Sequence, residues 1–192
     1  MDDDHGAGRR EYGDRGRGRS GGGGRFDRRP GPPRSTTAAS EEPEAAKPAR
    51  TLLEELLGKM GIDDVAIVYI ARSEGEYFEI RGPRLANLIG RNGNTLEALN
   101  LIFNNIMNAD RRNNRRYFTI DAEGYRARRA DALKEVAIAA MERAVREGTP
   151  QKLEPMLPSE RKIVHVTISE NPAVRTESEG EEPERRVVIF PV

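Results

Sequence analysis

Two glycines three positions apart form the most informative motif of the chain, the turn Gly90-Arg91-Asn92-Gly93. Because glycine has no Cβ, the backbone of such a turn can come very close to a ligand. A helical pattern begins directly after the turn, so its free N–H groups would face an anion, and Arg91 adds a mobile cation. The spacing therefore predicts a phosphate-binding turn, although ordinary helix–helix turns share it.

This turn differs from the phosphate loop of nucleotide hydrolases. Such a loop has four residues between its glycines and ends in Gly-Lys-Ser/Thr, whereas here Asn94 and Thr95 follow Gly93. The chain has no Cys and only two His, and no paired carboxylates or activated Ser stand out. We therefore expect no catalytic residues, no metal and no cofactor, and predict that the protein is not an enzyme.

A second pair of residues with chemical potential is Arg161 and His165. Residues four apart share one face of a helix, so both side chains would point the same way. Lys162 lies one position off that face. An isolated pair of this kind is typical of a surface Arg beside a half-buried His, so its meaning depends on the surrounding sequence.

Four arginines also gather between two predicted elements: Arg111, Arg112, Arg115 and Arg116. A cationic loop of this kind could guide a nucleic acid towards a neighbouring groove. It could equally be a solvated turn. We predict that these arginines give electrostatic support to a nearby binding site.

The elements that must position the turn read as α-β-β-α-(GxxG)-α-β. Thr51 and Glu54 have the form of a capping box and predict a helix that starts at residue 51. β-Branched and aromatic runs predict strands at 65–70, 77–80 and 117–120, the first two as a hairpin. Asn94 is expected to cap the helix after the turn, with Glu97 at N3. This order predicts an α+β fold with helices on one face of a sheet.

The C-terminal part carries a second set of elements. We expect a long helix at 124–146, a short strand at 151–153, a helix capped by Ser159, and strands at 174–178 and 185–190. An acidic loop, residues 179–184, joins the last two strands. The long helix could belong to either set of elements or connect both.

The first 50 residues differ in composition, because they contain no Leu, Ile or Val. Such a segment buries too little apolar area to order itself, so we predict a disordered Gly/Arg/Pro-rich tail. Its Arg-Gly run at 15–19 either binds RNA loosely or only solubilises the chain. We expect three parts: residues 1–50, 51–122 and 123–192.

Composition adds further bounds. The 192 residues carry 32 basic and 32 acidic side chains, which gives a formal net charge of zero. No apolar run approaches the roughly 20 residues of a membrane span, and we see no secretory signal. These features predict a cytoplasmic protein without a membrane span.

With its flanking helices, the turn resembles a KH (K-homology) domain of the bacterial, type II arrangement. In that family the GxxG loop clamps the backbone of about four nucleotides, and an apolar groove receives the bases. The resemblance implies that Gly90, Arg91, Asn92 and Gly93 bind RNA. By the same resemblance, the groove edge would be formed by Ile89, Asn94 and Thr95.

Residues 153–189 resemble the small single-stranded nucleic-acid-binding domain that is named after its Arg-x-x-x-His motif. The resemblance rests on Leu-Glu-Pro-Met at 153–156, Pro-Ser-Glu-Arg at 158–161, His165, the acidic loop and Arg-Arg-Val-Val-Ile at 185–189. It implies that Arg161 is a fork for phosphate and that His165 donates or stacks. Lys162 is a weaker candidate in the same site.

A KH domain followed directly by such a domain is the architecture of the bacterial Jag family, also called KhpB or EloR, and the resemblance covers about residues 51–192. It implies a single-stranded RNA-binding regulator, of the RNA chaperone kind, that influences cell elongation and envelope synthesis. It also implies a small single-KH-domain protein as partner. Many members carry a folded N-terminal Jag domain where we expect the tail.

Two other functions stay open from the sequence. The first is an interaction scaffold in which nucleic-acid binding is incidental, which the zero net charge favours slightly. The second is single-stranded DNA as the ligand, because an Arg-x-x-x-His face would contact backbone more than sugar. A scaffold should keep its partners after Arg91→Asp and Asn92→Asp, and a DNA binder should bind matched RNA and DNA equally.

Overall fold

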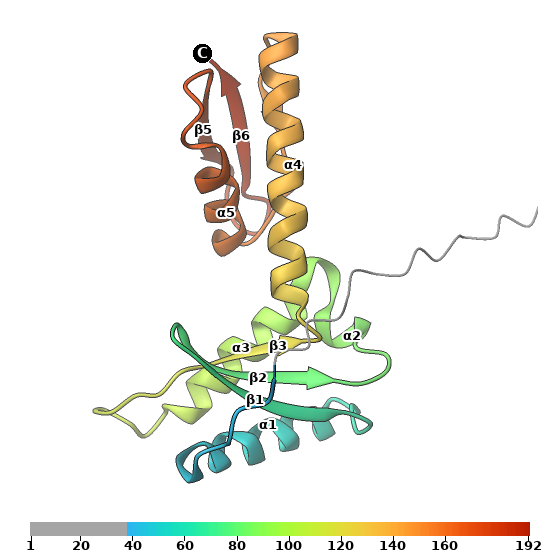
Figure 1. Cartoon of the computed structure of the whole chain (residues 1–192), viewed down its shortest axis with the longest axis vertical. Coiled ribbons are helices and arrows are strands. Elements are labelled where there is room, and N and C mark those ends of the chain that lie inside the picture. The colour runs from blue at the N-terminus through green and yellow to red at the C-terminus, as the bar shows by residue number, and fades with distance from the viewer. Residues whose placement is uncertain (1–37) are drawn as a thin grey trace, which may run out of the picture. The chain divides into compact units, whose positions relative to one another are not determined.

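The computed structural model describes residues 38–192 (Figure 1). The Arg-Gly run of the predicted tail lies outside the described residues. Within them we distinguish a first module, residues 44–122, and a second module, residues 125–191, each with its own hydrophobic core. None of the helices in these 155 residues (38–192) is long and apolar enough to cross a membrane.

The first module has the predicted order of elements. Its helices are the 3-10 turn η1 (Glu44–Ala46), α1 (Lys47–Lys59), α2 (Ala86–Ile89), the 3-10 turn η2 (Arg91–Gly93) and α3 (Asn94–Met107). Its strands are β1 (Ala66–Arg72), β2 (Gly75–Arg81) and β3 (Phe118–Ala122). β2 pairs with β1 in antiparallel and with β3 in parallel orientation, so the sheet order is β1-β2-β3.

The first helix starts earlier than the capping box at Thr51 predicts. Thr51 lies inside α1, where its hydroxyl donates to the Lys47 carbonyl (3.2 Å). Ala46 and Ala49 are fully buried, so this end of the helix packs through small residues rather than through Leu, Ile or Val. The prediction of disorder up to residue 50 is therefore wrong for residues 44–50.

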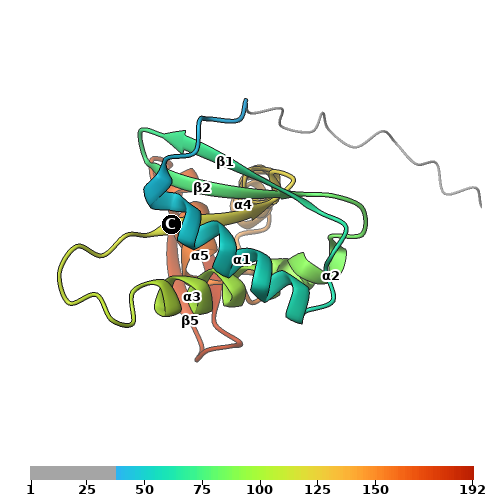
Figure 2. The same cartoon turned by 90° about the horizontal axis from the view of Figure 1, so that it is seen from below.

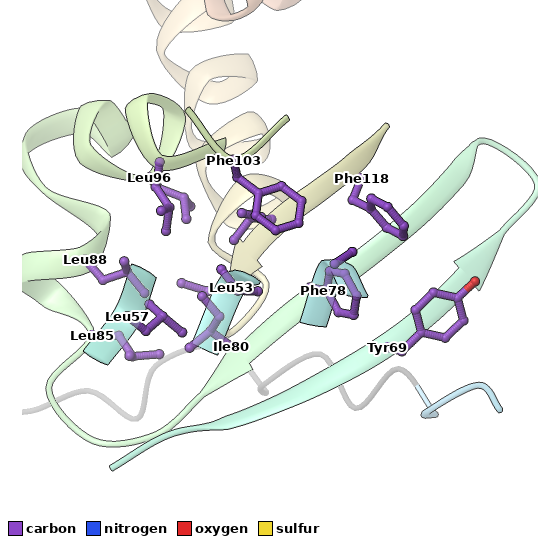
Figure 3. Packing of buried hydrophobic residues seen from close by; sticks show 14 of the residues in the cluster. Leu53, Leu57, Tyr69, Phe78, Ile80, Leu85, Leu88, Leu96, Phe103 and Phe118 are labelled. Atoms are coloured by element: carbon purple, nitrogen blue, oxygen red, sulfur yellow. The ribbon is translucent and has the colours of Figure 1, made fainter. Parts of the chain in front are cut away.

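Two helices cover one face of this sheet (Figure 2), and aromatic rings fill the space between them. Phe78 on β2 stacks on Phe118 of β3, with ring centroids 5.1 Å apart, and both rings meet Phe103 of α3 edge-on. Leu53 and Leu57 of α1 pack into the same core (Figure 3). This packed layer holds α3, and with it the GxxG turn, at a fixed place on the sheet.

The outer edge of β3 is closed by side chains of α3 instead of another strand. The side chains belong to residues one helical turn apart: Asn100, Asn104 and Asn108. Asn104 accepts from the N–H of Phe118 (2.9 Å) and donates to its carbonyl (2.8 Å). Asn108 likewise accepts from the N–H of Arg116 and donates to its carbonyl. Asn100 accepts from the N–H of Ile120. These amides satisfy backbone groups that would otherwise invite another strand.

The second module also follows the predicted order. Its elements are α4 (Tyr125–Glu147), β4 (Gln151–Lys152), α5 (Pro158–Ile168), β5 (Val174–Glu179) and β6 (Arg186–Pro191). The sheet is antiparallel with order β4-β6-β5. α5 begins one residue before the predicted cap Ser159, and the Glu160 carboxylate accepts from the N–H of Leu157 instead (3.1 Å).

The long helix α4 joins both modules. Its first residue, Tyr125, packs against the first core, while Leu133, Ala137 and Ala144 belong to the second. Glu123 and Gly124 precede it with positive φ angles of 48° and 66°, which turn the chain out of β3. The alternative in which α4 connects both sets of elements is therefore the correct one.

Candidate nucleic-acid interface

The backbone of the GxxG turn (residues 90–93) requires glycine at its first position. Gly90 has φ 71° and ψ −176°, a conformation essentially restricted to glycine. A Cβ built there would lie 2.1 Å from Oγ1 of Thr95 in the first turn of α3. The absence of a side chain at Gly90 thus lets α3 begin directly against the turn.

The second glycine is required by a contact with the second module. Gly93 has φ 78°, and a Cβ on it would lie 2.6 Å from the ring of Tyr125. Figure 1 shows this turn, between α2 and α3, beside the first turn of α4. Gly93 is also the N-cap residue of α3, so Asn94 is the first helical residue and the predicted Asn94 cap is wrong.

The two central side chains of the turn are exposed. Within residues 38–192, neither Arg91 nor Asn92 has an ion pair or a side-chain hydrogen bond to the protein. Asn92 adopts the left-handed conformation (φ 53°, ψ 28°), which Asn tolerates better than most residues. The turn therefore presents a cation, an amide and the start of α3 to solvent, all of which suit an oxyanion.

The predicted groove residues flank the turn but differ in exposure. Ile89 is half-buried and packs against the first core, Thr95 is half-buried against Gly90, and Asn94 is exposed. Only Asn94 is thus fully presented beside Arg91 and Asn92. Ile89 contributes an apolar flank rather than a free face.

In the second module, Arg161 is buried, and both terminal nitrogens of its guanidinium have partners. Its side chain is 10% exposed, Nη1 donates to the Met156 carbonyl (2.9 Å), and Nη2 pairs with Oε1 of Glu182 (2.7 Å). Glu182, in the acidic loop, is 53% exposed. Arg161 therefore links two loops, and the Glu182 carboxylate already occupies its Nη2 group.

His165 lies one turn further along α5 and is held by two hydroxyls. Nδ1 is 2.7 Å from Oγ1 of Thr176, and Nε2 is 3.0 Å from Oγ of Ser178. Burial lowers the pKa of His165, and the neighbouring Arg161 charge lowers it further. The imidazole is thus maintained in its neutral form, with both nitrogens engaged on β5. Lys162 is exposed and points elsewhere on the helix surface.

The four-arginine loop divides into one structural and three exposed members. Arg116 binds the carboxylate of Glu76 through Nε (2.6 Å) and Nη2, and the Tyr69 hydroxyl donates to the same carboxylate (2.5 Å). Burial and this carboxylate raise the pKa of Tyr69 to about 12. Arg116 is therefore part of the fold of the first module.

The exposed members are Arg111, Arg112 and Arg115. They follow the C-terminus of α3, whereas the GxxG turn precedes its N-terminus. A 14-residue helix is about 20 Å long, so a ligand would need to span roughly that length to contact both. These arginines do not join the turn in one compact site.

A cleft of about 600 Å³ opens beside the GxxG turn. Arg91, Asn92 and Asn94 line it from the first module. Met156 and Glu182, the two residues that hold the Arg161 guanidinium, line it from the second. The structure therefore brings the turn and the immediate partners of Arg161 to one cleft, which the sequence alone did not indicate.

The cleft carries charges of both signs. Its arginines are Arg91 and Arg186, and its carboxylates are Glu97, Glu154, Glu182 and Glu184. Three of these carboxylates are paired with arginines: Glu97 with Arg126, Glu182 with Arg161, and Glu184 with Arg186. Arg91 has no such partner among residues 38–192, so it is the uncompensated cation of the cleft. Electrostatics thus favour the GxxG wall as the place where a phosphate would bind.

Two arginines at the start of α4 form ion pairs whose partners sequence reasoning missed, and the first of these pairs joins the two modules. Arg126 pairs with Glu97 of α3 (2.9 Å), and Arg129 pairs with Glu160 of α5 (2.6 Å). Cations near a helix N-terminus are unfavourable for stability alone, which was the available signal that these residues are used. Across residues 38–192, no group of His, Asp and Glu could hold a metal ion.

Comparison with known proteins agrees with this architecture. Residues 131–191 match the R-3-H domain family, which is named after the Arg-x-x-x-His motif. The chain is 31% identical over 138 residues to the RNA-binding protein KhpB of Clostridium symbiosum, covering 71% of this chain and 62% of that protein. It is 34% identical over 148 residues to KhpB of Bacillus subtilis, covering 73% of this chain and 65% of that protein. The chain thus spans less than two thirds of either relative.

Proposed function

The chain belongs to the Jag (KhpB) family, and on this premise we propose that it is a single-stranded RNA-binding regulatory protein that grips the RNA backbone without covalent chemistry. The relatives are named RNA-binding proteins. The observation that carries the proposal is the GxxG turn, whose exposed Arg91 and Asn92 side chains have no partner in the described part of the chain.

The turn would bind phosphate with three kinds of group. The first N–H groups of α3 point towards it, Arg91 supplies charge, and Asn92 supplies a neutral donor. Gly90 and Gly93 let the turn pack closely against Thr95 and the Tyr125 ring, where a side chain would clash. This arrangement suits a backbone grip that tolerates many sequences.

The Arg-x-x-x-His face, formed by Arg161 and His165 on α5, would act only after an exchange of partners. The Nη2 group of Arg161 holds the Glu182 carboxylate, which is half exposed and sits on a loop. A phosphate oxygen is a chemically equivalent acceptor and could replace it. We propose that RNA binding in this module competes with Glu182, so the face contributes less affinity than the GxxG turn.

The expected small single-KH-domain partner is part of the same proposal. Support comes from large apolar residues on α3 that are about half exposed or more: Leu101, Ile102 and Ile106. An apolar stripe of this kind on a helix is typical of a protein contact. The influence on cell elongation and envelope synthesis rests on family resemblance alone.

Binding of a fluorescent, unstructured RNA oligomer, measured by anisotropy beside a DNA oligomer of the same sequence, tests the proposal. We expect the parent chain to bind RNA, and Arg91→Asp/Asn92→Asp to weaken binding at least tenfold. Equal affinity for the DNA oligomer would instead support a single-stranded DNA ligand. If the double variant binds RNA like the parent while the α3 stripe still captures the single-KH partner, the scaffold function would replace the proposal.

A further inference from the structure

One carboxylate of the cleft of about 600 Å³ has no partner among residues 38–192, that of Glu154. It lines the cleft from the second module, whereas the GxxG turn lines it from the first. The other three carboxylates of the cleft are each paired with an arginine. The cleft thus presents an unpaired cation, Arg91, on one wall and an unpaired carboxylate on the other.

The fold fixes the position of Glu154 although its side chain is exposed. Its neighbours Leu153 and Met156 are buried. Their N–H groups donate to the carbonyls of Val187 (2.9 Å) and Arg185 (3.2 Å), respectively. Because the backbone is held on both sides of Glu154, its carboxylate stays at the cleft wall and does not move with a free loop.

A carboxylate in this place restricts what the cleft can bind. An ionised carboxylate accepts hydrogen bonds and donates none. It also repels phosphate, so a nucleic-acid strand in the cleft has to turn a donor group towards Glu154. Hydrogen bonds that involve a charged group are the stronger ones, so such a donor would add appreciably to affinity.

The ribose 2′-hydroxyl is the donor that agrees with a grip on the backbone. Each ribose is joined covalently to the phosphates, so a phosphate held at the GxxG turn brings a sugar into the cleft whatever the base is. The 2′-hydroxyl is present in every RNA nucleotide and absent from DNA. Amino groups of bases are absent from uracil, so a contact with them would make the grip depend on sequence.

We propose that Glu154 accepts a hydrogen bond from a ribose 2′-hydroxyl of the strand that the GxxG turn grips, and that this contact makes the protein prefer RNA over DNA. The inference rests on the proposed function, because the turn has to hold the strand. Arg91 and Asn92 would bind the phosphates that RNA and DNA share, while Glu154 distinguishes the sugars. The second module thereby selects RNA without any release of Arg161 from Glu182.

Three oligomers of one sequence test the contact with the parent chain: RNA, 2′-fluoro RNA, and DNA with deoxyuridine in place of thymidine. They share their bases and differ at the 2′ position. We expect RNA to bind about tenfold more tightly than the other two, the gain typical of a hydrogen bond to a charged group. The 2′-fluoro sugar retains the pucker of RNA but has no donor, so RNA-like affinity of this oligomer would overturn the hydroxyl contact.

Variants of the carboxylate show whether Glu154 is responsible. Removing a negative charge strengthens the binding of RNA and DNA alike, so the readout is the ratio of the two affinities. Glu154→Ala should lower this ratio to about one, and Glu154→Gln, which keeps a neutral acceptor, to an intermediate value. Glu181→Ala is the matched control, because Glu181 is exposed on the acidic loop and does not line the cleft. A ratio that Glu154→Ala leaves at the parent value would refute the role of Glu154.

Further outcomes separate the possible failures. If Glu154→Ala weakens binding of RNA that contains cytosine or adenine but not of oligouridine, the carboxylate contacts a base amino group and the sugar assignment is wrong. Arg91→Asp/Asn92→Asp should weaken RNA and DNA binding by the same factor and leave the ratio unchanged. A parent chain that binds no RNA would refute the proposed function itself, whereas RNA binding without a preference over DNA would refute only the role of Glu154.

Discussion

The two motifs that carry the family resemblance are in opposite states. In the GxxG turn, the central side chains Arg91 and Asn92 are exposed and have no partner in the described part of the chain. In the Arg-x-x-x-His face, the Arg161 side chain is 10% exposed and both His165 nitrogens are hydrogen-bonded. The polar side chains of the first motif are therefore available to a ligand, whereas those of the second already have partners within the protein.

This difference separates two roles that a motif residue can have. The Arg91 side chain makes no ion pair or hydrogen bond with residues 38–192, so those contacts give it no structural role. Arg161 fastens the Met156 carbonyl and the acidic loop, so its position has a structural explanation that is sufficient without RNA. Binding and stability measurements on matched variants should therefore give opposite patterns for the two motifs.

The largest effect expected is on stability. Arg161→Ala removes two hydrogen bonds made by a charged group and leaves the Met156 carbonyl without its donor, so we expect the free energy of unfolding to fall by about 2–3 kcal/mol. Arg91→Ala should change it by less than about 0.5 kcal/mol. Urea unfolding followed by circular dichroism measures both. Equal decreases for the two variants would contradict the contrast between the motifs.

The next effect is on RNA affinity. Arg91→Asp/Asn92→Asp should weaken binding at least tenfold without unfolding the protein, because Asp tolerates the left-handed conformation of residue 92. Arg143→Asp/Arg146→Ala on the exposed surface of α4 changes the net charge by the same amount and serves as control. Anisotropy titrations should separate the two. A similar decrease in RNA affinity for the control would show that the effect comes from the net charge of the protein and not from the turn.

A smaller gain is expected when the internal anion is neutralised. Glu182→Gln weakens the contact that competes with phosphate at Arg161, so RNA affinity should rise by about two- to fivefold, in line with the modest strength of half-exposed ion pairs. Glu181→Gln makes the same charge change one residue away on the exposed loop. Equal gains for both would show a general electrostatic effect instead of release of Arg161.

The smallest effect concerns pH. The pKa of His165 is lowered in the folded state, so its contribution to stability is fully present above about pH 6.5, the usual pKa of an unfolded His. As the pH falls below that value, the unfolded chain binds a proton first and stability declines. His165→Gln should remove this component from the unfolding free energy measured between about pH 5 and 8. An unchanged pH profile would show that the imidazole is not held neutral.

The order of helices and strands was predictable from the sequence because the local sequence signals agree with one another. Hairpin and helix periodicity, together with the glycines at 90 and 93, indicated the α-helices and strands of the first module but not the 3-10 turn η1. The start of α1 was missed because it is buried through Ala46 and Ala49, which carry no apolar periodicity. The amide ladder at the edge of β3 was also missed, since Asn residues at i, i+4 spacing usually lie on an exposed helix face.

The residues of the candidate site were predictable from the sequence, but which of their side chains are paired within the fold was not. Arg116 was expected to be a free cation, yet its partner Glu76 is 40 residues away and could not be identified by spacing. The same holds for Glu182 beside Arg161 and for Tyr125 against Gly93. Pairing across the fold decides which cations remain for a ligand, and only the tertiary structure contains that information.

The most direct test of the central claim is the salt dependence of RNA binding for the parent chain and for Arg91→Asp/Asn92→Asp. Removing one phosphate contact to a single strand flattens the log–log slope by roughly 0.7. We predict a slope reduced by at least that amount in the double variant, and no reduction in Arg143→Asp/Arg146→Ala. Parallel slopes for the parent and the double variant would contradict the claim that the GxxG turn grips the RNA backbone.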